Sequence, residues 1–134
     1  MSYLIDSDWV IDYLAGRPTA GNLIDRLAVD GIAISVLTYL EAIEGLRGSH
    51  EPLAADHVLQ QFLQAAPMFG ISPLIAERAA SIRIDLRRQK RQVNHRALDI
   101  LIAATAIEHS LSLVTRNIRD YADIPDLVIF QSEL

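Results

Sequence analysis

The sequence predicts one α/β domain over residues 1–134, with a mainly parallel sheet of four to five strands flanked by helices. Short apolar runs alternate along the chain with segments of helical periodicity, a pattern typical of parallel α/β proteins. A chain of 134 residues, of which 51% are hydrophobic, is long enough to bury the core of one domain. No internal repeat, low-complexity tract or linker divides it, so we expect a single unit.

The expected strands are short runs of mostly apolar residues without polar alternation. Such runs are typical of strands that are buried on both faces of a sheet. They comprise residues 3–5, 32–35, 68–71, 111–115 and 127–130.

The expected helices lie between these strands and are bounded by capping residues, proline and glycine. Ser7 or Asp8 can cap the first helix. Gly16 and Pro18 then end it, and Ser72, which precedes a proline, opens the longest helix. The helices comprise residues 9–15, 22–29, 37–46, the segment from 52 up to 67, 73–91 and 98–109, and residues 117–121 form a turn or short helix.

The composition excludes several classes of protein. The absence of cysteine excludes disulfides, thiol catalysis and thiolate zinc sites. No apolar run reaches about 18 residues and the start does not resemble a signal peptide, so we expect a soluble, cytoplasmic protein. The net charge of −5 argues against a general nucleic-acid binder. It does not exclude a nuclease, because acids gathered around a metal also count as negative.

The segment 98–109 is apolar nearly all the way round, which predicts a helix packed on more than one side. Asp99 is the exception, and a carboxylate in such a segment needs a partner. Its place in the first turn allows the helix dipole and free backbone N–H groups to stabilise the charge. The alternative is that this helix delivers a carboxylate to a metal site.

Other acids and an amide are expected at the same edge of the sheet. Asp6 follows the first strand, Glu41 lies early in the helix after the second, and Asn117 and Asp120 follow the fourth. The helix that carries Asp99 joins the fourth strand by a short connection, so helix and strand should run antiparallel. This places the start of the helix at the carboxyl end of that strand, where ligands bind in open parallel sheets.

Such a cluster of acids requires protons or a cation. Two carboxylates about 4 Å apart repel by roughly 4 kcal/mol at an effective dielectric constant near 20. Mg²⁺ or Mn²⁺ prefers oxygen ligands, keeps waters for substrate phosphates and lowers the pKa of a bound water. The hydroxyls of Ser7 and Thr38 could bond to ligand carboxylates from behind.

Four blocks of sequence, in order, resemble the PIN-domain family and, within it, the VapC-type ribonuclease toxins of bacterial toxin–antitoxin pairs. They read Leu-Ile-Asp-Ser-Asp, Ile-Ser-Val-Leu-Thr-Tyr-Leu-Glu, Leu-Asp-Ile-Leu-Ile-Ala-Ala-Thr-Ala and Leu-Val-Thr-Arg-Asn-Ile-Arg-Asp-Tyr. The resemblance implies that Asp6, Glu41 and Asp99 bind metal. It also implies an endoribonuclease that uses Mg²⁺ or Mn²⁺ and a metal-activated water, forms homodimers and is silenced by a small antitoxin.

The fourth acidic position is where the chain departs from the family pattern. The family often has aspartate two residues after the threonine matched by Thr115, whereas this chain has Asn117 there. Either Asn117 or Asp120, one turn later, could complete the metal shell. We expect Thr115 to support the site from behind, and we expect a set of arginines to hold the RNA: Arg87, Arg88, Arg91, Arg96 and Arg116.

Two other functions fit parts of the pattern. A phosphoacceptor signalling module also places acids at the carboxyl edge of a parallel sheet, but it normally needs a lysine after a late strand. The only lysine here, Lys90, lies in the basic end of the helix 73–91. A catalytically inactive member of the family that acts only as a binding module is the other alternative, and Asn117 in place of an acid is the observation that favours it.

Overall fold

The sheet of the computed structural model consists of short parallel strands in the order β3-β2-β1-β4. The structure describes residues 2–48 and 52–131, with the side chains of residues 52–55 left out. The strands are β1 (Tyr3–Ile5), β2 (Ile32–Ser35), β3 (Met68–Phe69) and β4 (Ser112–Val114). Leu4 in β1 pairs with Ala33 on one side and Leu113 on the other. The strand order therefore reverses at β1, between β2 and β4, which is where open parallel sheets bind ligands.

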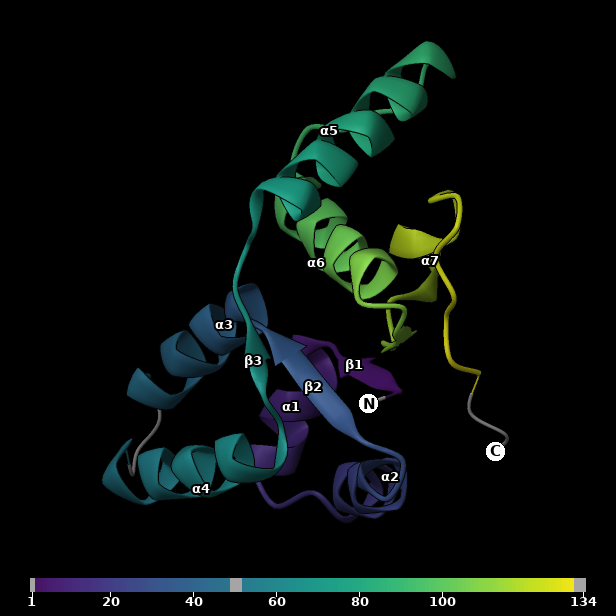
Figure 1. The fold of residues 1–134 in the computed structure, drawn as a ribbon. Coiled ribbons are helices and arrows are strands. Elements are labelled where there is room, and N and C mark those ends of the chain that lie inside the picture. The colour runs from purple at the N-terminus through teal and green to yellow at the C-terminus, as the bar shows by residue number, and fades with distance from the viewer. Residues whose placement is uncertain (1, 49–51, 132–134) are drawn as a thin grey trace.

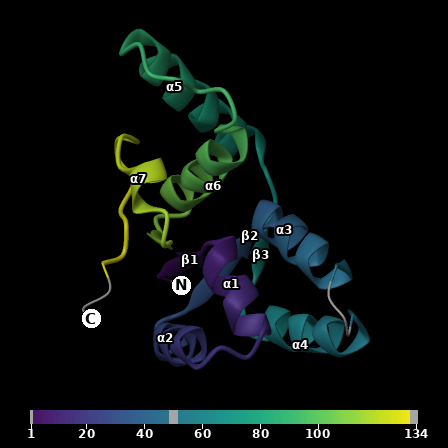
Figure 2. The same ribbon diagram turned by 180° about the vertical axis from the view of Figure 1, so that it is seen from behind.

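Helices cover both faces of this sheet, as Figures 1 and 2 show from opposite sides. Their bounds are α1 (Ser7–Leu14), α2 (Pro18–Ala28), α3 (Val36–Arg47), α4 (Pro52–Ala65), α5 (Pro73–Arg88), α6 (Ala97–Glu108) and α7 (Ile118–Tyr121). The predicted parallel α/β sheet flanked by helices is confirmed. Within the described ranges, every helix is too short or too polar to cross a membrane.

The two faces of the sheet support separate apolar clusters. Leu4 and Leu113 face α5 and α6, whereas their neighbours Ile5 and Val114 face α1, α2 and α4. Successive strand residues point to opposite faces, so each strand contributes to both clusters. Helices cover both faces of the sheet, and this explains why the strand sequences lack polar alternation.

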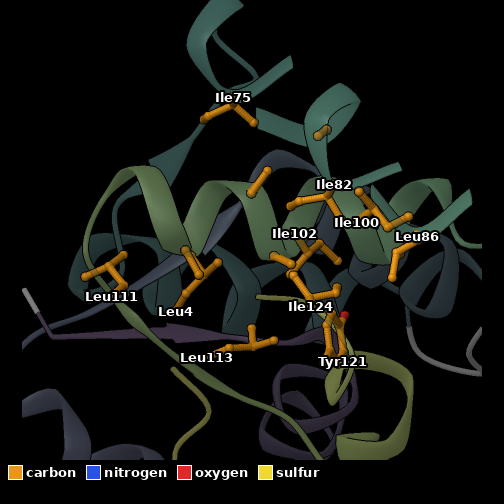
Figure 3. Packing of buried hydrophobic residues seen from close by; sticks show 14 of the residues in the cluster. Leu4, Ile75, Ile82, Leu86, Ile100, Ile102, Leu111, Leu113, Tyr121 and Ile124 are labelled. Atoms are coloured by element: carbon orange, nitrogen blue, oxygen red, sulfur yellow. The ribbon is translucent and has the colours of Figure 1, made fainter. Parts of the chain in front are cut away.

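Helix α6 is the most deeply buried helix of the first cluster, which Figure 3 shows from close by. Ile100, Ile102 and Thr105 are fully buried, and the helix packs against α5, the sheet and α7. The prediction of a helix packed on more than one side is confirmed. The helix comprises residues 97–108 instead of the expected 98–109. Asp99 lies in its first turn.

The start of α1 differs from the prediction. Asp6, and not Ser7 or Asp8, is the N-cap, and its carboxylate accepts a 2.8 Å hydrogen bond from the Ser7 N–H. Because β1 ends at Ile5, Asp6 is the first residue that leaves the strand while its backbone is still extended, as an N-cap requires. Pro18, which we expected only to end a helix, occupies the first position of α2. Proline suits this position because its missing N–H would have no helical partner.

The expected fifth strand is reduced to one bridge, between Leu113 and Ile129. The Leu113 N–H donates to the Val128 carbonyl, and the Phe130 N–H donates to the Leu113 carbonyl, both at 2.8 Å. The neighbouring residues of β4, Ser112 and Val114, direct their backbone groups to the other side, toward β1. A strand as short as β4 therefore offers one residue for pairing at this edge, and the prediction of a full strand was wrong.

Candidate active site

Asp6 lies at the carboxyl end of the central strand and is only 4% exposed. Its Oδ1 accepts the cap hydrogen bond from Ser7, and its Oδ2 accepts hydrogen bonds from the hydroxyls of Thr115 (2.8 Å) and Tyr121 (3.2 Å). Burial raises the pKa of the Asp6 carboxyl, the three hydrogen bonds lower it, and the charge of Asp99 raises it further. A buried carboxylate held by donors from three segments has a fixed position.

Asp99 reaches the same place from the first turn of α6. Its Oδ1 accepts a 3.2 Å hydrogen bond from the Tyr121 hydroxyl, the group that also contacts Asp6. Partial burial raises the pKa of Asp99, the Tyr121 hydrogen bond lowers it, Asp120 raises it and Arg96 lowers it. The structure therefore brings Asp6 and Asp99 together around one hydroxyl group, as the antiparallel arrangement of α6 and β4 predicts.

Glu41, in α3, belongs to the same electrostatic group. Burial raises its pKa first, followed by the charge of Asp6 and, after a lowering hydrogen bond from the Ser7 side chain, the charge of Asp99. Helix α3 is fixed behind it by Ser35, whose hydroxyl oxygen accepts a 3.1 Å hydrogen bond from the Thr38 N–H. The charges of Asp6 and Asp99 thus both act on Glu41, which places the three predicted acids in one region of the molecule.

The three expected supporting hydroxyls have different partners. Thr115 donates to Asp6, and the Ser7 side chain lies close enough to Glu41 to lower the pKa of that carboxyl. The hydroxyl of Thr38 instead accepts a 3.4 Å hydrogen bond from the buried Ser35 hydroxyl. Thr38 therefore helps to hold the start of α3, and its described hydrogen bonds do not reach a candidate ligand.

Asn117 and Asp120 lie on the exposed side of the site. Asn117 occupies the N-cap position of α7, and its N–H donates to Thr115 Oγ1 at 3.1 Å. Asp120, in the first turn of α7, acts on Asp99 through its charge and raises the pKa of that carboxyl. Both side chains border a shallow hollow lined by residues 116–120.

Tyr121 also belongs to the site, although the sequence did not predict it as a site residue. It is 1% exposed, its ring packs in the cluster of α5 and α6 (Figure 3), and its hydroxyl bridges Asp6 and Asp99. Burial and the two neighbouring carboxylates raise its pKa, so the hydroxyl keeps its proton. The signal in the sequence is its position one helical turn after Asn117, at the end of the fourth resembling block.

The five arginines expected to bind RNA have different surroundings. Arg96 pairs with Asp123 through Nη2–Oδ1 (2.7 Å) and Nη1–Oδ2 (3.0 Å), and also donates to the Asp120 carbonyl. Arg116 pairs with Asp12, and its guanidinium lies 3.9 Å above the centre of the Trp9 ring. The others are exposed: Arg91 approaches Asp123 at 3.7 Å, Arg88 approaches Asp85 at 3.9 Å, and Arg87 borders a groove between α5 and α6.

The donor chemistry of the site fits a hard divalent cation. Asp6, Glu41 and Asp99 offer carboxylate oxygens; burial raises the pKa of each, and the charge of Asp99 on Asp6 and the charges of both on Glu41 are repulsions that a cation would relieve. Within residues 2–48 and 52–131, no three acidic or histidine side chains are arranged closely enough to surround an ion. Asp6 and Asp99 are joined through the Tyr121 hydroxyl, and Glu41 is linked to them through the effect of their charges on its pKa.

The fold and the site together define a class of protein. It is a parallel α/β domain with a group of acidic residues where the strand order reverses. The family profile described as PIN domain matches residues 3–127, and the chain belongs to the PIN-domain family.

Relatives with names and solved structures match nearly the whole chain. Ribonuclease VapC19 of Mycobacterium tuberculosis strain ATCC 25618 / H37Rv is 38% identical over 129 residues, which cover 92% of this chain and 95% of that protein. A toxin–antitoxin complex from Klebsiella pneumoniae contains a chain with 30% identity and a TM-score of 0.73, with 95% of this chain and 96% of that one covered. The DNA-bound VapBC structure from Salmonella typhimurium gives 25% identity, a TM-score of 0.84 and coverage of 97% of both chains.

Proposed function

We propose that the protein is an endoribonuclease, the toxin of a toxin–antitoxin pair, which hydrolyses RNA phosphodiester bonds with the help of Mg²⁺ or Mn²⁺. The observation that carries the proposal is the pair Asp6 and Asp99, held at one hydroxyl at the carboxyl edge of the sheet. The relative with 38% identity is named a ribonuclease, which supports the choice of substrate.

Asp6 and Asp99 would hold the ion, and Glu41 would complete the acidic group from α3. We assign the fourth acidic group to Asp120, because Asn117 carries no charge and the charge of Asp120 acts on Asp99. A bound divalent ion would neutralise the clustered charge, lower the pKa of a water and stabilise negative charge on the phosphate. Thr115 and Ser7 would keep two of the carboxylates oriented.

The RNA backbone would be held by arginines whose guanidinium groups remain exposed to solvent. Arg87 and Arg88 are exposed at the end of α5, and the Arg88 pair with Asp85 is long and solvated. Arg91 follows this helix and is also exposed. Arg96 and Arg116 have close internal partners, so we assign them first to positioning α7 and the loop before it.

The antitoxin and a second copy of the chain are the proposed protein partners. A solved relative with 30% identity is a toxin–antitoxin complex, and another with 25% identity is a DNA-bound VapBC complex. An antitoxin that covers the acidic edge would silence cleavage. Co-expression with a short open reading frame from next to the gene, followed by size-exclusion chromatography with light scattering, tests both partners.

Cleavage of a structured RNA tests the catalytic assignment. The purified protein should cut such an RNA with Mg²⁺ or Mn²⁺ and stop in chelator. Asp6→Asn and Asp99→Asn should each abolish cutting with the fold intact by circular dichroism, whereas Asp30→Asn, which changes an exposed carboxylate, should leave it unchanged. Undiminished cutting by both site variants would refute the assignment, and failure to bind either ion in calorimetry would favour the inactive binding module.

A further inference from the structure

The hydroxyl of Tyr121 lies 3.2 Å from Asp6 Oδ2 and 3.2 Å from Asp99 Oδ1, so its single hydrogen is shared between two carboxylates. The tyrosine ring is 1% exposed and is fixed in the apolar cluster of α5 and α6. Tight packing prevents the ring from moving with the carboxylates. The hydroxyl that contacts both of them therefore has a fixed position.

The two aspartates depend on this hydroxyl to different degrees. Asp6 has two further donors, the Ser7 N–H and the Thr115 hydroxyl. Within the described residues, Asp99 accepts one side-chain hydrogen bond, and its donor is Tyr121. Without it, Asp99 is free to rotate away from Asp6, and repulsion between the two charges favours this movement.

The hydroxyl leaves room for an ion. A carboxylate has about four lone-pair positions, two on each oxygen. The described hydrogen bonds use two positions on Asp6 Oδ2 and one on Oδ1, which leaves one on Oδ1. On Asp99 they use one position on Oδ1 and none on Oδ2. Tyr121 therefore orients the two ligands while the oxygen positions that an ion needs stay open.

We propose that Tyr121 is a positioning residue, whose hydroxyl sets the spacing of Asp6 and Asp99 before the divalent ion arrives. The inference rests on the proposed function, because it assigns both aspartates to the ion. Outer-shell hydrogen bonds of this kind typically change metal affinity by about 10- to 100-fold when they are removed. The Tyr121 hydroxyl should act on ion binding and not on the affinity for RNA itself.

The test compares Tyr121→Phe with Tyr13→Phe. Both changes remove a hydroxyl that contacts an aspartate, but Tyr13 bonds to Asp25 at 3.3 Å, outside the site. The measurements are the Mn²⁺ dissociation constant by isothermal titration calorimetry and the Mn²⁺ concentration that gives half-maximal cleavage. We expect both values to rise about 10- to 100-fold for Tyr121→Phe and to stay at the wild-type value for Tyr13→Phe.

Saturating Mn²⁺ should restore most of the cleavage rate of Tyr121→Phe, a rescue that a loss of folding would not allow. Wild-type affinity or tighter binding in Tyr121→Phe would overturn the inference and leave the proposed function intact. A wild-type protein that binds no Mn²⁺ would overturn both. If Tyr121→Phe does not fold, NMR of the wild-type protein provides the test: the Tyr121 hydroxyl proton should exchange slowly and shift when Mg²⁺ is added, and a proton that does neither would refute the proposal.

Discussion

Replacement of Arg96 by methionine separates two roles that the sequence could not distinguish, RNA binding and attachment of α7. In the structure the Arg96 side chain is 20% exposed and that of Asp123 is 17% exposed, so their pair is largely shielded from water. Methionine keeps most of the apolar stem and removes the guanidinium. Arg88→Met is the matched control, because its pair with Asp85 is 3.9 Å long and the two side chains are 78% and 50% exposed.

The expected cost of Arg96→Met follows from these contacts. The variant loses two charge-assisted hydrogen bonds to Asp123 and one to the Asp120 carbonyl, and a hydrogen bond to a charged group contributes about 1.5–3 kcal/mol. Partial exposure and the remaining Arg91, 3.7 Å from Asp123, reduce the loss. We expect about 2 kcal/mol, or a fall of about 7 °C in the melting temperature for a domain of this length. Arg88→Met should cost less than about 0.5 kcal/mol.

The pH dependence gives a second check with a defined sign. Arg96 holds the pKa of Asp123 below its ordinary value, mainly through the hydrogen bond between them. The stabilisation is therefore present above the pKa of an unfolded aspartate, about 3.9, and is lost as the pH falls through the lower folded value. The difference in stability between wild type and Arg96→Met, measured by urea unfolding, should be constant from pH 7 to 5 and shrink below about pH 4.

An unchanged melting temperature in Arg96→Met would refute this reasoning. If RNA affinity, measured by fluorescence anisotropy well below the melting temperature, fell at the same time, the role of Arg96 in RNA binding would replace the structural one. We expect the reverse pattern, with reduced stability and an RNA affinity near that of the wild type.

Three further predictions concern the site and its support. In chelator, the melting temperature should rise as the pH is lowered from 7 to 5, because burial raises the pKa values of the site carboxylates and their protonation favours the folded state; Asp6→Asn should flatten this dependence. Ser35→Ala removes the cap that accepts from the Thr38 N–H and should cost about 1 kcal/mol in urea unfolding, and no loss would mean that the cap is replaced. Thr115→Val removes the 2.8 Å donor to Asp6 and should weaken Mn²⁺ binding in calorimetry, whereas unchanged binding would show that the remaining donors suffice.

The sequence predicted the placement of the acids because that placement follows from chain direction. Asp6 comes directly after a buried strand, and the antiparallel connection to β4 places Asp99 at the same edge. Both facts depend on local pattern and on the geometry of parallel sheets, and the effects of Asp99 on the pKa of Asp6 and of both aspartates on that of Glu41 agree with them. The fold class followed from the same reasoning.

Tyr121 and Arg96 could not be assigned in this way, because their roles depend on contacts distant in sequence. Tyr121 is apolar enough to be read as a core residue, and only the folded structure shows its hydroxyl between two carboxylates. Arg96 looked like a member of a basic surface because Asp123, its partner, lies 27 positions away. The missing fifth strand has a similar cause, since β4 offers a single residue for pairing on its outer side.

The hydrogen bonds around Asp6 also determine when the site can form during synthesis. Thr115 and Tyr121 are 109 and 115 positions later in the chain, and β1 pairs with β4 only after the long connection through α5 and α6 has been made. A ribosome adds about 5–20 residues per second, so most of the synthesis time passes before these partners emerge. An unfinished chain that ends before β4 has Asp6 but neither of its hydroxyl donors. The hydrogen bonds that orient Asp6 can therefore form only after the last part of the domain has been translated.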